Sequence, residues 1–334
     1  MMPVSETTVT QPVFLSDVHP RSRFMQAWES RKKSRRVSWL IECIAEAFGT
    51  FLYTYAGTGS TAGYILGNLA KLEGLSNLFQ IGVAYAVGIV MALSLCVSTS
   101  GGHINPAVTI TATIFGQCTP GKAARLIISQ IFGAYVACML VYVQYRDLII
   151  EVEDSLKKAG TFDTILFTPQ GPAGIFGLYS LPGLALGHIF LNEFVCDFVL
   201  GVTIFGSLDP TNFHIGPQAG VWLTAFAYAF VIWSFSPAAI ASNTARDVGG
   251  RLAAMTIYGT KAAGGSYSAI AALTSIPATF CAFVFYEFFL KDTSRVVTPE
   301  HLAHIQAHDA HIAKNNERAP SIASTVSDDK HSNV

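Results

Sequence analysis

The chain has 334 residues, of which 51% are hydrophobic and 13% are charged, and its formal net charge at pH 7 is -1. Soluble domains contain about 25% charged residues, so this composition excludes an ordinary soluble protein and indicates a polytopic membrane protein. No basic domain stands out beyond an amino-terminal cluster, and we therefore expect no nucleic-acid partner.

Residues 1–36 form a polar tail that ends in a run of basic side chains. The run consists of Arg31, Lys32, Lys33, Arg35 and Arg36. Positively charged segments next to a membrane span stay on the cytoplasmic side, so we predict that this tail is cytoplasmic. Residues 1–20 lack the apolar region of a secretory signal, and the first hydrophobic span is expected to serve as the membrane anchor.

Six apolar runs follow, each of which we read as a membrane-spanning helix. They are approximately Ser38–Gly59, Phe79–Val97, Ala123–Tyr145, Leu184–Phe205, Gly220–Trp233 and Tyr267–Leu290. An even number of spans returns the carboxyl terminus to the cytoplasm. We predict a membrane domain over 37–290, with halves at about 37–146 and 184–290, an outer loop at 147–183 and a cytoplasmic tail at 291–334.

Two short motifs among the apolar runs predict half-length helices. The first is SGGHINPAVT, Ser100 to Thr109, and the weaker second is SNTARDVGGRL, Ser242 to Leu252. Asn is favoured at a helix cap and Pro at the first helical position. A helix from Asn105 to before Cys118 would span roughly half of a 30 Å hydrocarbon core. Broken backbone at membrane depth is tolerated only where protein or a water-filled cavity surrounds it, so the motifs predict a pore lining.

The two halves of the chain also repeat. Glu46 and Glu193 open similar helices at an offset of 147 residues, and Asn105 and Asn243 are 138 residues apart. Three spans precede the repetition, so the halves must have opposite orientations in the membrane. This is the pattern of an inverted repeat, which places a functional site near the midplane where the halves meet.

In these motifs and in this repeat, the chain resembles the aquaporin and aquaglyceroporin family, the major intrinsic proteins. The motif residues that carry the resemblance are Asn105, Pro106, Ala107, Asn243, Thr244 and Ala245, with Arg246, Asp247, Glu46 and Glu193 in support. The resemblance implies an all-α membrane protein with six transmembrane helices and two re-entrant half-helices in an inverted repeat. Thr244 is a departure, because the family usually has Pro there.

The resemblance implies that the half-helices meet at the bilayer centre with their amino termini facing each other. Two positive dipole ends would then repel cations, protons included, while Asn105 and Asn243 offer side-chain NH2 groups to a passing oxygen. The family assigns Glu46 and Glu193 to hydrogen bonds that hold the loop backbones. By the same resemblance, His103 and Asp247 are expected to support the loops.

Family offsets from the two asparagines give a selectivity filter of Tyr85, Val231, Ile240 and Arg246. Strict water channels usually have His at the position of Val231. Apolar and aromatic walls facing one guanidinium leave room for a carbon chain while Arg246 donates to hydroxyl groups. We therefore expect a passive channel for glycerol and other small uncharged solutes, and for water, that excludes ions and protons.

Other interpretations remain open at this stage. They are a strict water channel of the same fold, an ion-coupled transporter, an intramembrane enzyme and a non-conducting family member. We expect no enzymatic activity, no cofactor and no metal, and a homotetramer in the lipid bilayer, in the plasma membrane. The histidines His301, His304, His308 and His311 share one predicted helical face, either as a pH-sensing or metal-binding stripe or as a solvated surface.

Overall fold

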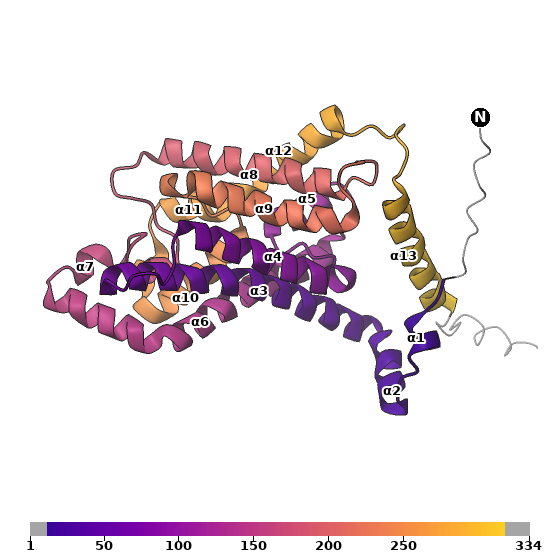
Figure 1. Ribbon diagram of the computed structural model, residues 1–334, viewed down its shortest axis with the longest axis horizontal. Helices are drawn as coiled ribbons and strands as arrows, with labels where there is room; N and C mark the ends of the chain where they lie inside the picture. Colours follow the sequence, from indigo (N-terminus) through magenta and orange to yellow (C-terminus); the bar gives the residue numbers. More distant parts are fainter. Residues whose placement is uncertain (1–11, 318–334) are drawn as a thin grey trace, which may run out of the picture.

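The computed structural model describes residues 12–317, and within this range every regular element is a helix (Figure 1). The predictions for 1–11 and 318–334, at the ends of the two tails, lie outside the described residues. The α-helices are α1 Leu15–Val18, α2 Arg23–Lys32, α3 Arg35–Ala70, α4 Leu78–Ser100, α5 Pro106–Ile114, α6 Pro120–Lys158, α7 Phe162–Ile165, α8 Leu186–Leu208, α9 Pro217–Phe235, α10 Thr244–Tyr258, α11 Tyr267–Leu273, α12 Ser275–Phe285 and α13 Pro299–Glu317. Short 3-10 helices η1 Pro172–Ile175, η2 Ser236–Ala238 and η3 Thr260–Ala263, and the π-helix η4 Tyr286–Leu290, complete the described chain.

Five of the predicted spans correspond to helices that are long and apolar enough to cross a membrane. These are α4, α6, α8, α9 and the combined run Tyr267–Leu290. The predicted first span, Ser38–Gly59, lies inside α3, which has 36 residues and carries Glu42 and Glu46 near its start. The predicted all-helical membrane fold with two short half-helices is confirmed.

Two helices extend past the predicted ends of their spans. Helix α3 continues to Ala70, and α6 continues to Lys158, so the first part of the predicted outer loop, residues 147–158, is helical. The extension of α6 is packed, because Ile149 and Val152 are buried in a cluster with residues of α3 and α10. Tertiary burial therefore continues the helix past the apolar run that marks the bilayer.

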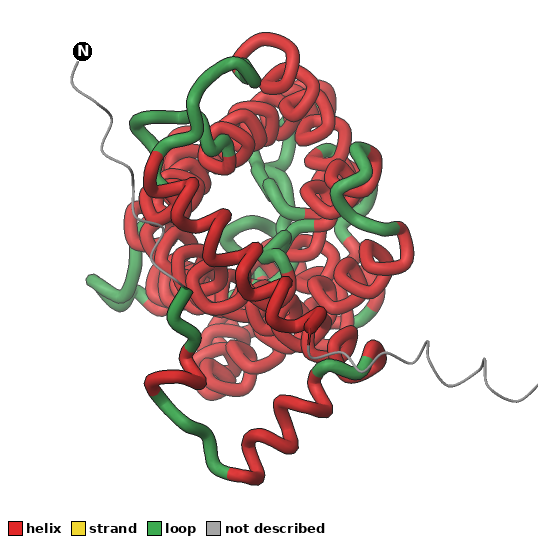
Figure 2. The backbone as a smooth tube through the Cα atoms, turned by 90° about the vertical axis from the view of Figure 1, so that its right-hand side faces the viewer, coloured by secondary structure: helices red, strands yellow, loops and turns green. Residues whose placement is uncertain are grey.

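The helices form a bundle in which the two halves interlock. In the first half α3 packs against α4 and α6, and in the second half α8 packs against α9 and α12. The short helix of each half lies against a long helix of the other half: α5 contacts α12, and α10 contacts α6. Figure 2, viewed along the length of the bundle, shows loop segments inside the ring of helices. The halves are thus joined through the two short helices.

The described ends of the chain lie at one end of the bundle, opposite α7 (Figure 1). Helix α13 begins after Thr298, whose backbone N–H donates to the carbonyl of Pro210 at 3.0 Å. His301 is buried and its Nδ1 lies 2.9 Å from the Thr298 hydroxyl, whereas His304 and His308 are exposed. The four histidines therefore do not form one solvated face, because His301 is buried at the start of the helix, where it contacts Thr298.

Candidate functional site

The two motif asparagines meet inside the bundle. Asn105 and Asn243 each cap a short helix, since their side-chain oxygens accept from the backbone N–H of Ala107 and Ala245 at 3.0 and 2.9 Å. Their amide nitrogens cross over: Asn105 Nδ2 donates to the carbonyl of Ser242 at 3.1 Å, and Asn243 Nδ2 donates to that of Ile104 at 2.9 Å. The two helix amino termini are therefore held together by a reciprocal pair of hydrogen bonds.

The residue before each asparagine has a left-handed backbone. Ile104 has φ 44° and Ser242 has φ 53°, a conformation that costs an ordinary residue of order 1–3 kcal/mol. A buried glutamate holds each of them: Glu46 accepts the Ile104 N–H at 2.6 Å, and Glu193 accepts the Ser242 N–H at 2.6 Å. Glu193 also accepts the neighbouring N–H of Ala241 with both of its oxygens. The repeated glutamates thus act on equivalent backbone positions.

Glu46 has additional side-chain partners. Ser100 Oγ donates to it at 2.6 Å and Gln130 Nε2 at 2.7 Å, and the same Gln130 nitrogen lies 3.0 Å from Thr109 Oγ1. His103 Nδ1 lies 3.1 Å from that threonine hydroxyl. His103 is accordingly part of the hydrogen-bond network that positions the first loop.

The second short helix has its own anchors. Thr244, which stands where the family usually has Pro, places its hydroxyl 2.9 Å from Ser275 Oγ on α12. Asp247 is fully buried and pairs with Arg251 one turn later, with an Nη2–Oδ1 distance of 2.6 Å. Arg251 also donates to the carbonyls of Leu178 and Ala263. These bonds tie α10 to α12, to η3 and to the segment between η1 and α8.

A cavity of about 190 Å³ opens beside the asparagine pair. Three of the four predicted filter residues line it: Tyr85, Ile240 and Arg246. The Arg246 guanidinium is buried and donates from Nε to the Tyr85 hydroxyl at 3.0 Å and from Nη1 to the Phe176 carbonyl at 2.9 Å. One oriented cation therefore lies among the apolar and aromatic side chains of the cavity wall.

Val231, the fourth predicted filter residue, is not among the residues that line this cavity, and its neighbour Ile232 is. The filter residue was predicted by counting twelve positions back from Asn243, and this count includes the irregular segment 236–242. A difference of one residue in that segment moves the predicted position to the next residue of helix α9. Tyr228 also lines the cavity, four residues before Ile232 and hence on the same helical face. Of these two neighbours, it is Ile232 that borders the cavity in the structure.

Sequence reasoning missed two tyrosines in this cavity wall. Tyr53 and Tyr228 are each 3% exposed, and their ring centroids lie 5.7 Å apart. Tyr53 also contacts the ring of Tyr85, with a centroid distance of 5.2 Å. Helical spacing offered a signal, because Tyr53 follows Glu46 by two turns and therefore lies on the same face of α3.

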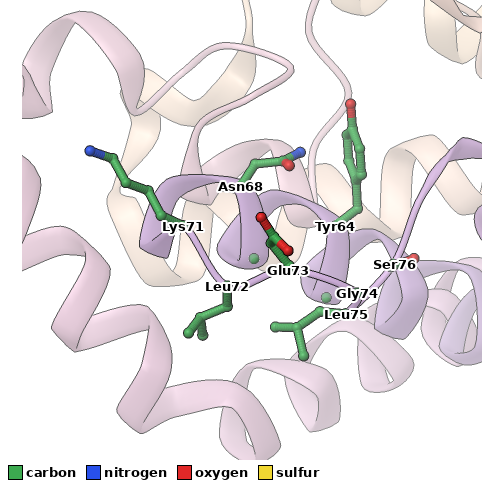
Figure 3. Close-up of a pocket in the computed structure, with 10 residues that line it drawn as sticks. Tyr64, Asn68, Lys71, Leu72, Glu73, Gly74, Leu75 and Ser76 are labelled. Carbon is green, nitrogen blue, oxygen red and sulfur yellow. The ribbon is translucent and has the colours of Figure 1, made fainter.

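A second cavity, of about 300 Å³, lies where α3 ends and turns toward α4 (Figure 3). Its lining includes Tyr64, Asn68, Lys71 and Glu73, and none of the predicted site residues. The wall comes from one short stretch of chain. It does not connect the two halves, so we place the functional site at the asparagine pair. Within residues 12–317 no group of His, Cys, Asp and Glu side chains is arranged to hold a metal ion.

Comparison with known proteins agrees with this geometry. The profile of the family described as Major intrinsic protein matches residues 33–268. The chain belongs to the major intrinsic protein family. Family membership, with the apolar helices, makes it an integral, multi-pass membrane protein.

Similar members of the family cover most of the chain. Aquaporin-3 of Laccaria bicolor is 53% identical over 296 residues, which are 88% of this chain and 90% of the relative. The glycerol uptake facilitator protein of Pseudomonas aeruginosa is 34% identical over 215 residues, or 63% of this chain and 73% of the relative. The X-ray structure of the aquaglyceroporin from Plasmodium falciparum matches with a TM-score of 0.64 at 19% identity, covering 75% of this chain and 97% of that chain. The fold is therefore that of this family.

Proposed function

We propose that the protein is a passive transmembrane channel for glycerol and other small uncharged solutes, and that water also passes. The family consists of passive channels, so we do not propose an enzymatic activity. The observation that carries the proposal is the pair of helix amino termini capped by Asn105 and Asn243, next to a cavity whose guanidinium faces aromatic and apolar walls. Relatives named glycerol uptake facilitator and aquaglyceroporin support the choice of solute.

The facing amino termini account for the exclusion of cations. Each short helix contributes the equivalent of roughly half a positive elementary charge at its amino terminus. Two such ends at one point, together with the Arg246 guanidinium, raise the electrostatic energy of any cation in the passage. A neutral solute meets hydrogen-bond donors there without a charge penalty.

The selectivity region in this proposal consists of Tyr85, Ile232, Ile240 and Arg246. A hydroxyl group of the solute accepts from the guanidinium, while its carbon backbone contacts the isoleucines and the tyrosine ring. Glu46 and Glu193 act as structural supports, because every hydrogen bond they accept comes from a loop backbone or from a side chain that holds a loop.

We also propose a homotetramer in the plasma membrane with both termini cytoplasmic and a channel domain over 37–290. The basic residues before the first span support this orientation by the positive-inside rule. Helices α4 and α8 expose large apolar side chains, including Met91, Leu95, Leu191 and Val195. Lipid or neighbouring subunits would cover these faces.

Reconstitution into proteoliposomes tests the solute class. Stopped-flow light scattering measures water flux under an impermeant osmolyte and glycerol flux under a glycerol gradient. We expect both fluxes, and we expect Ile232→His to suppress glycerol flux, while Val231→His changes it little. Water permeability without glycerol permeability would assign the protein to the strict water channels. Flux that saturates and depends on a sodium or proton gradient would assign it to the ion-coupled transporters.

A further inference from the structure

The hydroxyl of Tyr228 lies at the meeting point of the two short helices. Tyr228 is on α9, and its hydroxyl oxygen accepts a long hydrogen bond from Asn105 Nδ2 at 3.5 Å. Asn243 Nδ2 donates to the carbonyl of Ile104, the residue directly before Asn105. The phenolic oxygen therefore contacts one of the two amide groups that a passing solute would use.

The donors of the asparagines are already assigned in this structure. A side-chain amide has two N–H groups. Asn105 uses one for the carbonyl of Ser242, and Asn243 uses one for the carbonyl of Ile104. The remaining N–H of Asn105 is directed to the Tyr228 hydroxyl. A solute oxygen that binds this N–H must take the place of the phenolic oxygen.

The cavity supports the same conclusion. Tyr228, Tyr53 and Ser242 line it, but neither asparagine does. Asn105 is 3% exposed and Asn243 is 0% exposed, so water-sized molecules reach very little of the pair. The Tyr53 ring packs against the Tyr228 ring at an interplanar angle of 60° and holds it over the pair. The phenol thus separates the cavity from the asparagines.

We propose that Tyr228 is a gate at the bilayer midplane, whose hydroxyl substitutes for a solute hydroxyl in the closed state and whose ring turns into the adjoining cavity when a solute passes. This inference rests on the proposed function as a solute channel and adds a residue that determines specificity. The cavity of about 190 Å³ gives the ring room to change rotamer. The gate favours solutes with a hydrogen-bond acceptor such as a hydroxyl oxygen, because these replace the hydrogen bond that the Asn105 amide loses when the ring leaves.

The test compares Tyr228→Phe and Tyr228→Val with the unmodified channel in proteoliposomes. Phenylalanine keeps the ring and removes the hydroxyl that bonds to Asn105. We therefore expect water and glycerol permeability to rise by roughly fivefold, the effect of losing about one hydrogen bond from the closed state. Valine also removes the ring and should raise both permeabilities further. Tyr55→Phe is the matched control, because the Tyr55 hydroxyl bonds to Gln144 Oε1 away from the asparagine pair, and it should leave both permeabilities unchanged.

Two results would overturn the gate. One is a Tyr228→Phe channel whose water and glycerol permeabilities do not exceed those of the unmodified protein, whatever the result for Tyr228→Val. The hydrogen bond of the phenolic oxygen would then not hold the closed state. The other is an equal increase in Tyr55→Phe. Thermal unfolding and size-exclusion elution establish that the variants are folded before the comparison.

The gate and the solute class fail separately. If glycerol does not pass any variant but water permeability still rises in Tyr228→Phe, the gate is supported and the glycerol assignment is wrong. If glycerol passes all variants equally, the glycerol assignment is supported and the gate is wrong.

Discussion

Replacement of Gly57 by alanine tests whether the ring of Tyr85 defines the width of the passage. Gly57 is a buried residue of α3, and a Cβ atom added there would lie 2.1 Å from Cε1 and Cζ of Tyr85. Ordinary carbon contacts are at roughly 3.5 Å, so the ring must move by about 1.4 Å. The cavity that Tyr85 lines gives the ring room to move away from α3. The shift also displaces the hydroxyl that accepts from Arg246 Nε at 3.0 Å.

The expected magnitude follows from the packing cost. A solute that passes the displaced ring makes an overpacked contact with it, which costs about 1–3 kcal/mol at the narrowest point, and each 1.4 kcal/mol or so added to the barrier slows passage about tenfold. We therefore expect glycerol permeability of Gly57→Ala to fall by roughly 5- to 150-fold. Water is the smaller solute, and its permeability should fall less. Stopped-flow light scattering at matched protein content gives both values.

Gly59→Ala is the control for this experiment. It lies on the same helix, and its added Cβ would meet nothing within 4 Å. Both replacements gain similar helix propensity, about 1 kcal/mol, so a difference between them reports on the Tyr85 contact. Glycerol permeability of Gly57→Ala equal to that of Gly59→Ala would refute the reasoning, because the tyrosine ring would then not border the passage.

The remaining predictions concern the supports of the site. Glu193→Leu leaves two loop N–H groups without an acceptor, so we expect a loss of about 2–6 kcal/mol, measured as a lower unfolding temperature in detergent, with a smaller loss in Glu193→Gln. Asp247→Ala leaves the Arg251 charge buried and unpaired, which should cost about 3–5 kcal/mol, and Asp247→Ala with Arg251→Met should recover most of it; no recovery would contradict the pairing argument. Burial acts to raise the pKa of Asp209, in the loop between α8 and α9, but hydrogen bonds from Thr211 and Tyr286 outweigh it and hold the pKa below its ordinary value of 3.8. The ionised form therefore stabilises the fold above pH 3.8, and this contribution is lost as the pH falls through the lower, folded-state pKa. The unfolding temperature should drop on acidification in the unmodified protein and drop less in Asp209→Asn; parallel curves would contradict the assignment.

The local features of this protein followed from the sequence because they depend on neighbouring residues. The caps at Asn105 and Asn243 need only the asparagine side chain and the N–H groups two or three residues later. The long helices followed from apolar length, and the inverted repeat followed from the spacing of two glutamates and two asparagines. The lengths of α3 and α6 did not follow, since packing beyond the bilayer extends them.

The inner face of helix α9 was decided by the tertiary structure alone. Helix α9 is apolar on every side, because lipid and the protein interior both accept hydrophobic side chains, so its sequence carries no amphipathic pattern to mark the inner face. A shift of one residue rotates the side chain by about 100°, which separates Ile232 from Val231. The contacts of Tyr228 with Asn105 and of Tyr85 with Arg246 join residues 123 and 161 positions apart. The rotation of packed helices about their axes sets such contacts, and no local pattern in this chain encodes it.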